Sequence, residues 1–447
     1  MTTTLPWEVI EHILHFLKPP KDLPTIRACS LVSHGCNFLM RPKVFHSITL
    51  IPSGDFNVGS TTARGFLSLL ETSPDIAQYV KTLTISEIDL GPVSRTPMIH
   101  RQSWAKRWLD TEFLVVIKLV DLATELDTIK LMLHHRDWIT LDKRLEQALE
   151  DVLKRSTIQA VSLSGINFLP KWFSRVLRSK RHLMVSSFYF VISFEPPSPT
   201  NASFALETLV VGPNVLEHHP PMRVLNQLLQ PSGMTSNLRF LDIAIDGGTA
   251  SRDEIPLLIS FCSMSLEQLG LQLVPCTGYD VMHREMTLDL ESLIDMTSFP
   301  LLHTISVSVP ICAPGCSHDE HSSDRLLTIL RSLADTIPLK SGTDLKIELT
   351  IWLNARVPVL YVPSGEFVWS WKILDSHLER LLQGGVQEMD IKILEDPEGV
   401  ELTKEDLEGV ILRTHLRQTS TSDRGTVRIS KASELPCWHP AYGSMIL

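Results

Sequence analysis

The chain has 447 residues, of which 43% are hydrophobic and 21% are charged, a balance typical of globular domains and unlike that of disordered proteins. Its 41 Lys and Arg residues are outnumbered by 51 Asp and Glu residues, which gives a formal net charge of −10. This charge argues against general binding to nucleic acid, because contacts with phosphates depend on an excess of basic side chains.

The cysteine content and the hydropathy of the chain indicate the cellular compartment in which we expect it. The seven cysteines are odd in number and scattered, which predicts reduced thiols in the cytoplasm or the nucleus. No apolar stretch reaches the roughly 18 residues that a membrane-spanning helix needs. Polar residues such as Glu8, Glu11 and His12 also interrupt any secretory signal at the N-terminus. We therefore expect a protein without a membrane anchor.

The first predicted element is a helix that begins near Pro6, since proline is well tolerated in a first helical turn. Apolar residues then recur at steps of three and four, which indicates one apolar face. These residues are Val9, Ile10, Ile13, Leu14 and Leu17. The pair Pro19-Pro20 is expected to end this helix.

Two further helices are predicted before the first strand. Residues 22–24, Asp-Leu-Pro, are typical of the cap and first turn of a second helix. We expect Gly35 to break that helix and a short third helix over residues 37–40 to end at Pro42. Alternating residues over 46–50 predict the start of a strand.

This N-terminal segment resembles the F-box, in the form common in large fungal families of F-box proteins. The resemblance depends on three runs, Leu5-Pro6-x-Glu8-Val9-Ile10-x-x-Ile13-Leu14-x-x-Leu17, Cys29-Ser30-Leu31-Val32-Ser33 and Val44-Phe45-x-x-Ile48-x-Leu50. Two positions depart from the family's pattern. His34 stands where a basic residue is typical, and Cys36 where a tryptophan is expected. The alternative interpretation is a plain helical cap on the domain that follows.

The resemblance implies a three-helix segment that docks a Skp-type adaptor and, through it, a cullin-RING ubiquitin ligase. A physical argument points the same way, because so short a segment buries little apolar surface by itself and needs another surface to cover it. The residues that the match assigns to adaptor contact are Leu5, Pro6, Ile10, Ile13, Leu14, Leu31, Val32 and Phe45.

After a loop over residues 51–62, one apolar pattern keeps returning, apolar-x-x-apolar-x-apolar, whose last two residues are spaced as on one strand face. It occurs at Val80-Leu83-Ile85, Leu126-Ile129-Leu131, Ile158-Val161-Leu163, Leu206-Leu209-Val211, Leu238-Leu241-Ile243, Leu266-Leu269-Leu271, Leu302-Ile305-Val307 and Val386-Met389-Ile391. Strict alternation over 345–353 predicts one more strand. Helices are expected between the strands, over residues 65–70, 111–122, 141–155, 223–229, 255–262, 288–296, 324–334 and 369–382.

Strand followed by helix, repeated, predicts an α/β fold, and the pattern resembles an irregular, degenerate leucine-rich-repeat solenoid. Only Asn214 stands cleanly where a regular repeat carries its asparagine. Another α/β or α+β array, such as a doubly wound domain, is the alternative, although the Gly-rich turns of nucleotide-binding folds are missing from the sequence. We divide the chain into an F-box over 1–50, a linker over 51–62, the solenoid over 63–416 and a C-terminal tail over 417–447.

The sequence has one concentrated set of metal-ligating residues, Cys312, Cys316, His318 and His321. Zinc prefers four such ligands in a tetrahedron. These four lie on one short loop that also contains Pro and Gly, so we interpret them as an adventitious polar loop. The motifs GxSxG, GxxxxGK[ST], HExxH and GxGxxG are absent from the sequence. We therefore expect no catalysis, no resident metal and no cofactor.

Together these features predict a substrate-recognition subunit of an SCF-type E3 ubiquitin ligase. The F-box would hold the adaptor, and the solenoid would bind an unknown target protein on its strand face or on the neighbouring loops. Two alternatives stay open. One is an F-box scaffold that acts outside any ligase, and the other is an unrecognised hydrolase or metal enzyme that uses residues 312–321.

Overall fold

The chain forms two compact units, Met1–Ser193 with Gly443–Leu447 and Phe194–Tyr442. Both units combine helices with parallel strands, which confirms the predicted α/β class. The computed structural model describes residues 6–18, 22–51, 61–87, 108–168, 180–186, 189–190, 206–212, 237–245, 254–273, 298–311, 320–337, 344–353, 371–395, 416 and 425–431.

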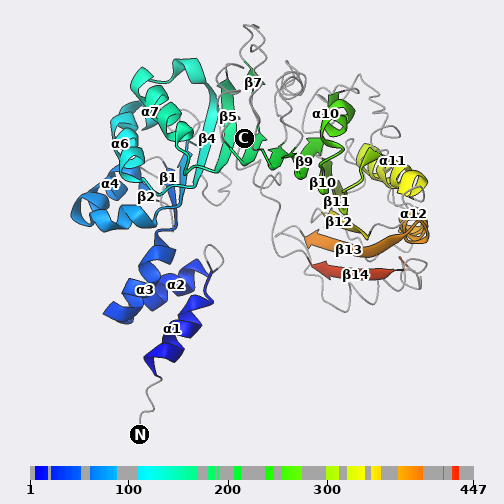
Figure 1. The fold of residues 1–447 in the computed structure, drawn as a ribbon, viewed down its shortest axis with the longest axis horizontal. Coiled ribbons are helices and arrows are strands. Elements are labelled where there is room, and N and C mark those ends of the chain that lie inside the picture. The colour runs from blue at the N-terminus through cyan, green and yellow to red at the C-terminus, as the bar shows by residue number, and fades with distance from the viewer. Residues whose placement is uncertain are drawn as a thin grey trace. The chain divides into compact units, whose positions relative to one another are not determined.

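The first unit begins with three helices (Figure 1), which are α1 (Trp7–His15), α2 (Leu23–Ser30) and α3 (His34–Val44). Pro6 directly precedes α1, and α2 has Asp22 at its N-cap and a proline in its first turn. The first two predicted helices are therefore confirmed at the positions that the prolines indicated.

The third helix is longer than predicted, because neither Gly35 nor Pro42 ends a helix. The helix begins at Ser33, whose Oγ accepts a hydrogen bond from the Cys36 N–H at 3.1 Å. Gly35 lies in the first turn, and a Cβ there would be 2.7 Å from the Trp7 ring, so glycine allows this ring to approach the helix. Pro42 lies in the last turn, where it removes one N–H donor, and the helix still continues to Val44.

A parallel sheet follows the three helices in the first unit, with the strand order β2-β1-β3-β4-β5-β6 and with β7 beside β5. Its strands are β1 (Ser47–Ile51), β2 (Thr61–Thr62), β3 (Thr82–Ser86), β4 (Thr128–Asp137), β5 (Ala160–Phe168), β6 (His182–Ser186) and β7 (Tyr189–Phe190). Figure 1 shows α4, α6 and α7 on one side of this sheet. The helices are α4 (Ala63–Thr72), η1 (Pro74–Tyr79), α6 (Trp108–Leu122), η2 (Trp138–Thr140) and α7 (Lys143–Lys154).

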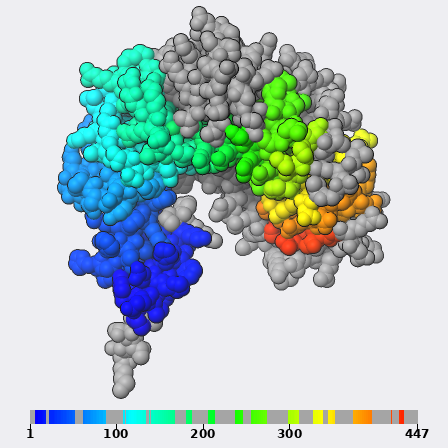
Figure 2. Space-filling model, in the orientation of Figure 1, coloured from blue at the N-terminus to red at the C-terminus, as the bar shows by residue number. Residues whose placement is uncertain are grey.

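The second unit has a sheet in which each strand pairs in parallel with the next strand of the chain. Its strands are β8 (Thr208–Val211), β9 (Phe240–Ile245), β10 (Gln268–Leu273), β11 (Thr304–Ile311), β12 (Leu345–Leu353), β13 (Val386–Glu395) and β14 (Thr426–Lys431). In Figure 2 the colours of this unit run in order from green through yellow to red, since each element lies beside its neighbours in sequence. The helices are α10 (Glu254–Cys262), α11 (Glu320–Thr336) and α12 (Trp371–Gln383).

The order of the strands can be compared with the order expected for the doubly wound alternative. A doubly wound sheet reverses its strand order at a switch point. From β3 to β6, and again from β8 to β14, the strand order follows the order of the chain. The doubly wound alternative therefore does not fit the second sheet, whereas the first sheet reverses its order once, at β1, which has the two-residue strand β2 on one side and β3 on the other.

The apolar triplets predict strands correctly, since each of them coincides with a strand. The first residue of each triplet is fully buried, and except at Val386 it precedes its strand, as at Leu126 and Leu238. The next residues alternate, so that β9 has half-buried and buried side chains in turn. One strand face therefore carries the apolar core, and the other is less buried and carries polar and apolar side chains, which on β9 are Phe240, Asp242 and Ala244. Outside the described residues lie most of the predicted loop over 51–62 and the predicted helices over 223–229 and 288–296.

The sheets extend beyond the range 63–416 that the sequence analysis assigned to the solenoid. At one end β1, which lies in the predicted F-box, pairs with β3. At the other end β14, which lies in the predicted tail, pairs with β13. Strand β6 was not predicted, because Lys180 stands where a triplet has its first apolar residue, ahead of Leu183 and Val185. Because this position is a lysine, the sequence does not show the apolar triplet here.

Candidate functional site

The three N-terminal helices share a small core. Leu14, Ile26, Cys36 and Met40 are buried together, and the half-buried residues packed against them are Ile10, Leu17, Cys29, Leu39 and Val44. Cys36 stands where the F-box pattern carries a tryptophan, and its side chain fills a core position. An aromatic ring is present beside it, because Trp7 packs over the preceding residue, Gly35.

Lys43 joins α3 to the end of α1. Its Nζ donates hydrogen bonds to the carbonyl oxygens of Leu14, His15 and Leu17 at 2.8, 3.0 and 2.7 Å. Carbonyls at the end of a helix have no intrahelical donor, so a cation there is favourable. Burial lowers the pKa of Lys43, while the charge of Asp22 acts in the opposite direction. This contact holds α1 and α3 in one relative orientation.

Outside this core the three helices carry large apolar side chains in contact with solvent. Three of them recur on α1 at steps of four and three and therefore share a helix face. Two more lie in the turn after α2, and one lies on α3. These residues, which we call the apolar surface, are Val9 (41% exposed), Ile13 (53%), Phe16 (67%), Leu31 (87%), Val32 (75%) and Phe38 (71%).

The seven described residues among those predicted to contact the adaptor fall into three groups. Pro6, Ile13, Leu31 and Val32 are exposed. Ile10 and Phe45 are half-buried, and Leu14 is a core residue whose side chain faces the other helices. Leu5 lies outside the described residues.

Three residues of the apolar surface were not predicted as contact residues. Val9 belongs to the apolar stripe of α1, and Phe16 follows Ile13 at a helical step of three, so helical periodicity could have identified both. Phe38 has no such signal. Its exposure follows from the way α3 packs against the other helices.

An ion pair ties the three helices to the first sheet unit. Arg41 of α3 lies 2.8 Å from a carboxylate oxygen of Asp75 in η1, and both side chains are partly exposed. α3 also leads into β1 within a few residues. The three helices are therefore continuous with the sheet of the first unit.

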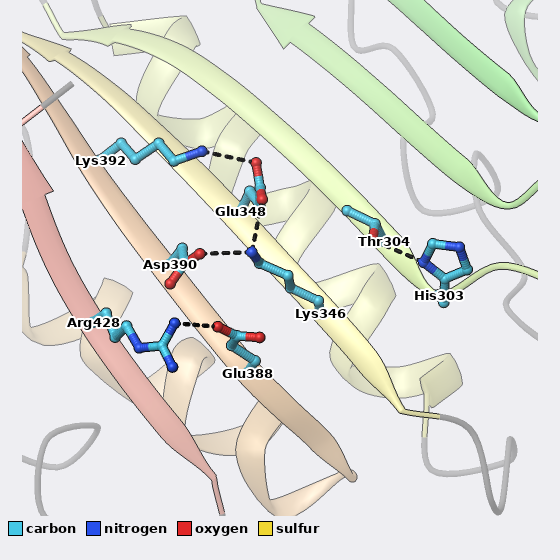
Figure 3. A network of polar contacts seen from close by, with 8 residues as sticks. All are labelled: His303, Thr304, Lys346, Glu348, Glu388, Asp390, Lys392 and Arg428. Atoms are coloured by element: carbon cyan, nitrogen blue, oxygen red, sulfur yellow. Dashed lines mark hydrogen bonds and ion pairs between the residues drawn. The ribbon is translucent and has the colours of Figure 1, made fainter. Parts of the chain in front are cut away.

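The polar strand face of the second unit is a second candidate site. Strand register places its residues in rows across the sheet, and one row contains Asp242, Gly270, Ser306, Glu348, Asp390 and Arg428. The carboxyl-bearing part of this face over β12, β13 and β14 holds paired charges (Figure 3). Such a face offers hydrogen-bonding groups and charge to a protein partner.

The charges on β12, β13 and β14 neutralise one another. Lys346 lies 2.9 Å from Glu348 and 2.7 Å from Asp390, and Lys392 lies 2.9 Å from Glu348 (Figure 3). Hydrogen bonds to Asp390 and Glu348 hold the pKa of Lys346 well above its usual range. Burial acts to raise the pKa of Glu348, but hydrogen bonds from Lys392 and Lys346 lower it. Each of these two carboxylates therefore has a lysine beside it.

The predicted polar loop with metal-ligating residues cannot be placed. Cys312, Cys316 and His318 lie outside the described residues, and His321 lies in the first turn of α11. Among the residues that the structure does describe, no group of three or more metal-ligating side chains comes together.

Comparison with known proteins adds no assignment. No family model matches the chain, and no curated protein matches its sequence. Across the described part of the chain, every helix is too short or too polar to span a bilayer.

Proposed function

We propose that this chain is a substrate-recognition subunit of an SCF-type E3 ubiquitin ligase. In this proposal α1, α2 and α3 form an F-box that docks a Skp-type adaptor. The strands and helices that follow form a degenerate leucine-rich-repeat solenoid that binds a target protein. The single observation that carries the proposal is the apolar surface on the three N-terminal helices.

The distribution of exposed apolar side chains supports a docking role for these helices. Of the 13 large hydrophobic side chains that are exposed among the described residues, seven lie between Trp7 and Phe38. Exposed apolar residues that are scattered singly need no explanation, whereas a concentration of them marks an interaction surface. Covering one such side chain contributes about 1.5–3 kcal/mol. The resemblance of this segment to the F-box supports a Skp-type adaptor as the partner.

The arrangement of the strands supports the second half of the proposal. Parallel strands in chain order, with helices on one side, are what a repeat solenoid presents. The opposite face, with its polar rows, is the surface on which a target would lie. The chain would then do no chemistry itself. It would raise the effective concentration of a target near the ubiquitin-transfer machinery by holding both at once.

Adaptor capture tests this function. We expect the full chain to co-purify with a Skp-type adaptor and to lose it when Ile13 and Leu31 are both changed to Asp, because a charge on each exposed side chain opposes burial in an interface. Leu114, which is 56% exposed on α6, is the matched control. We expect Leu114→Asp to retain the adaptor.

Three outcomes would contradict the proposal. The full chain could fail to recover an adaptor, the double variant could capture it as well as the unaltered chain does, or Leu114→Asp could lose it equally. Recovery of the adaptor without a cullin would favour a scaffold that acts outside a ligase. Circular dichroism of each variant checks that the helices are still formed.

A further inference from the structure

Asp242 on β9 differs from the other described carboxylates on the strand face of the second unit. Glu348, Asp390 and Glu388 each have a Lys or Arg side chain beside them, as Figure 3 shows. No Lys or Arg among the described residues forms an ion pair with Asp242. Its Oδ2 accepts a hydrogen bond from Gln272 Nε2 at 2.6 Å, while its Oδ1 is shielded from solvent and has no hydrogen-bond partner.

Gln272 on the neighbouring strand β10 adds a second acceptor without a partner. Its side chain is only 6% exposed, and its Oε1 is buried without a hydrogen bond. Native proteins pair nearly all buried polar atoms, so each exception calls for an explanation. Here two such oxygens, Asp242 Oδ1 and Gln272 Oε1, belong to side chains that are hydrogen-bonded to each other. Both oxygens need a donor.

Gly270 is what allows the carboxylate to take this position. Strand register places Gly270 directly beside Asp242. A Cβ at Gly270 would lie 2.4 Å from Asp242 Oδ1, which is far inside contact distance. The carboxylate therefore lies over a bare stretch of backbone that any other residue would cover. The arrangement depends on three residues of two strands and is a built feature of the sheet.

Ionisation of Asp242 is unfavourable in the protein alone. Burial raises the pKa of Asp242 to about 6, although hydrogen bonds from Gln272 and from the backbone N–H of Ile243 act in the opposite direction. Its neighbours in the row, Val210 and Gly270, carry no charge. At neutral pH the protein therefore holds a largely ionised carboxylate that nothing described compensates. Groups destabilised in this way are concentrated at functional sites.

We propose that Asp242 and Gln272 receive the guanidinium group of an arginine side chain from the target protein. A guanidinium is a planar group with several N–H donors, and it binds two acceptor oxygens at once more readily than the point charge of a lysine does. As a whole residue Asp242 is half-buried and lies on the strand face, and a guanidinium that reaches Oδ1 must displace the groups that shield this atom from solvent. The inference rests on the proposed function, because it names a feature of the target that the strand face would bind.

The test uses the full chain and a small probe, arginine amide acetylated at its α-amino group. The citrulline counterpart has the same shape without the charge, and lysine amide acetylated at its α-amino group carries an ammonium instead. Binding is measured by ligand-observed NMR at pH 7. We expect the arginine probe to bind at least about tenfold more tightly than the other two. We expect Asp242→Asn to remove the difference between the arginine and citrulline probes.

The control variant is Glu388→Gln, which removes a carboxylate from the same strand face at the Arg428 pair and is expected to leave probe binding unchanged. Asp242→Asn is also expected to raise the unfolding midpoint at pH 7, because it removes an uncompensated charge. A loss of binding together with a gain in stability would show that the variant has not simply unfolded.

Equal binding of the arginine and citrulline probes, or binding that survives Asp242→Asn, overturns the inference. Equal binding of the lysine probe overturns the assignment to arginine. None of these results bears on adaptor capture, which depends on α1, α2 and α3. Conversely, a chain that fails to capture an adaptor but binds the arginine probe would refute the proposed function and leave this site standing.

Discussion

Basic side chains close the C-terminal ends of several helices in this chain. Lys43 does so for α1. Arg155 Nη1 donates to the carbonyl oxygens of Val120 and Ala123 at the end of α6, at 3.1 and 3.4 Å. Lys180 Nζ donates to two carbonyls just after α7. Each of these side chains comes from a later element, so the cap also fixes how successive helices and strands meet.

Lys43→Met is expected to destabilise the three N-terminal helices by about 1.5–3 kcal/mol, because a charged donor that serves three carbonyls is lost. Amide hydrogen exchange in α1 measures the effect. Lys143→Met is the control, since Lys143 is exposed and its one ion pair with a described residue is with Glu146 on its own helix, a contact worth about 0.3–0.5 kcal/mol. Unchanged exchange rates in α1 of the Lys43 variant would contradict the prediction.

Lys180 gives the protein a pH dependence with a defined sign. Its side chain is fully buried by surface area, and burial lowers its pKa from 10.5 to about 8. Between these two values the unfolded chain binds more protons than the folded one, so the free energy of unfolding rises as the pH rises. The full rise is at most about 3 kcal/mol.

We expect Lys180→Met to lack this rise. Urea denaturation of both proteins at pH 7.5 and pH 10 measures it, and the difference between them isolates Lys180 from the other groups that titrate in this range. Equal changes in the two proteins would show that Lys180 is not desolvated in the folded state.

Several strands of the repeating elements are tied to the strand before them by a recurrent pair of backbone hydrogen bonds. The carbonyl oxygen of Asp127 accepts from the N–H groups of Gln159 and Ala160, at 2.8 and 3.1 Å. The carbonyl of Arg239 does the same for Glu267 and Gln268, at 2.8 and 2.9 Å. In these repeats the first apolar residue of the triplet stands directly before this pair, as Ile158 and Leu266 do. Its burial therefore places the start of the strand in register with its neighbour.

We expect the first residue of a triplet to contribute much more to the free energy of unfolding than an exposed residue of the same type does. Leu266 is fully buried before β10, and Leu257 on α10 is 41% exposed. We expect Leu266→Ala to lower the free energy of unfolding by about 2–5 kcal/mol through loss of packing and a cavity. Leu257→Ala, the same change at an exposed position, is expected to cost about 0.5 kcal/mol. Similar denaturation midpoints for the two variants would refute a register role for the triplet.

The structure shows at which residue a deletion of the three N-terminal helices can end without removing a strand of the sheet. The predicted F-box ended at residue 50, but β1 is part of the first sheet and pairs with both β2 and β3. A deletion that includes β1 would expose the edge of β3, and an unpaired edge strand promotes aggregation. A deletion that ends at residue 45 leaves the sheet complete.

We expect the chain that lacks residues 1–45 to stay monodisperse in size-exclusion chromatography, to lose the adaptor and to keep its other bound proteins. The chain that lacks residues 1–51 is expected to aggregate. Affinity purification with each of them compares the two sets of bound proteins. Adaptor capture by the shorter deletion would place the docking surface outside the three helices.

Local pattern was sufficient for most of the elements, because helix and strand formation depends on residues near one another in sequence. The apolar triplets identified strands, and the prolines identified the starts of α1 and α2. Where one residue served a distant partner, the pattern misled. Gly35 accommodates Trp7 and therefore does not end a helix. Lys180 donates hydrogen bonds to carbonyls beside α7 and therefore occupies a buried position that is apolar in the triplets.

The sequence by itself determined the α/β class, the recurring strands and the helical character of the N-terminal segment, since periodicity of apolar residues is a local property. Only the tertiary structure decided which apolar residues face solvent. Leu14 and Ile13 are neighbours in α1, yet the first is core and the second is 53% exposed. The Asp242 site was equally hidden, because its hydrogen bond joins side chains 30 residues apart. Contacts of this kind depend on strand register, which no short stretch of sequence contains.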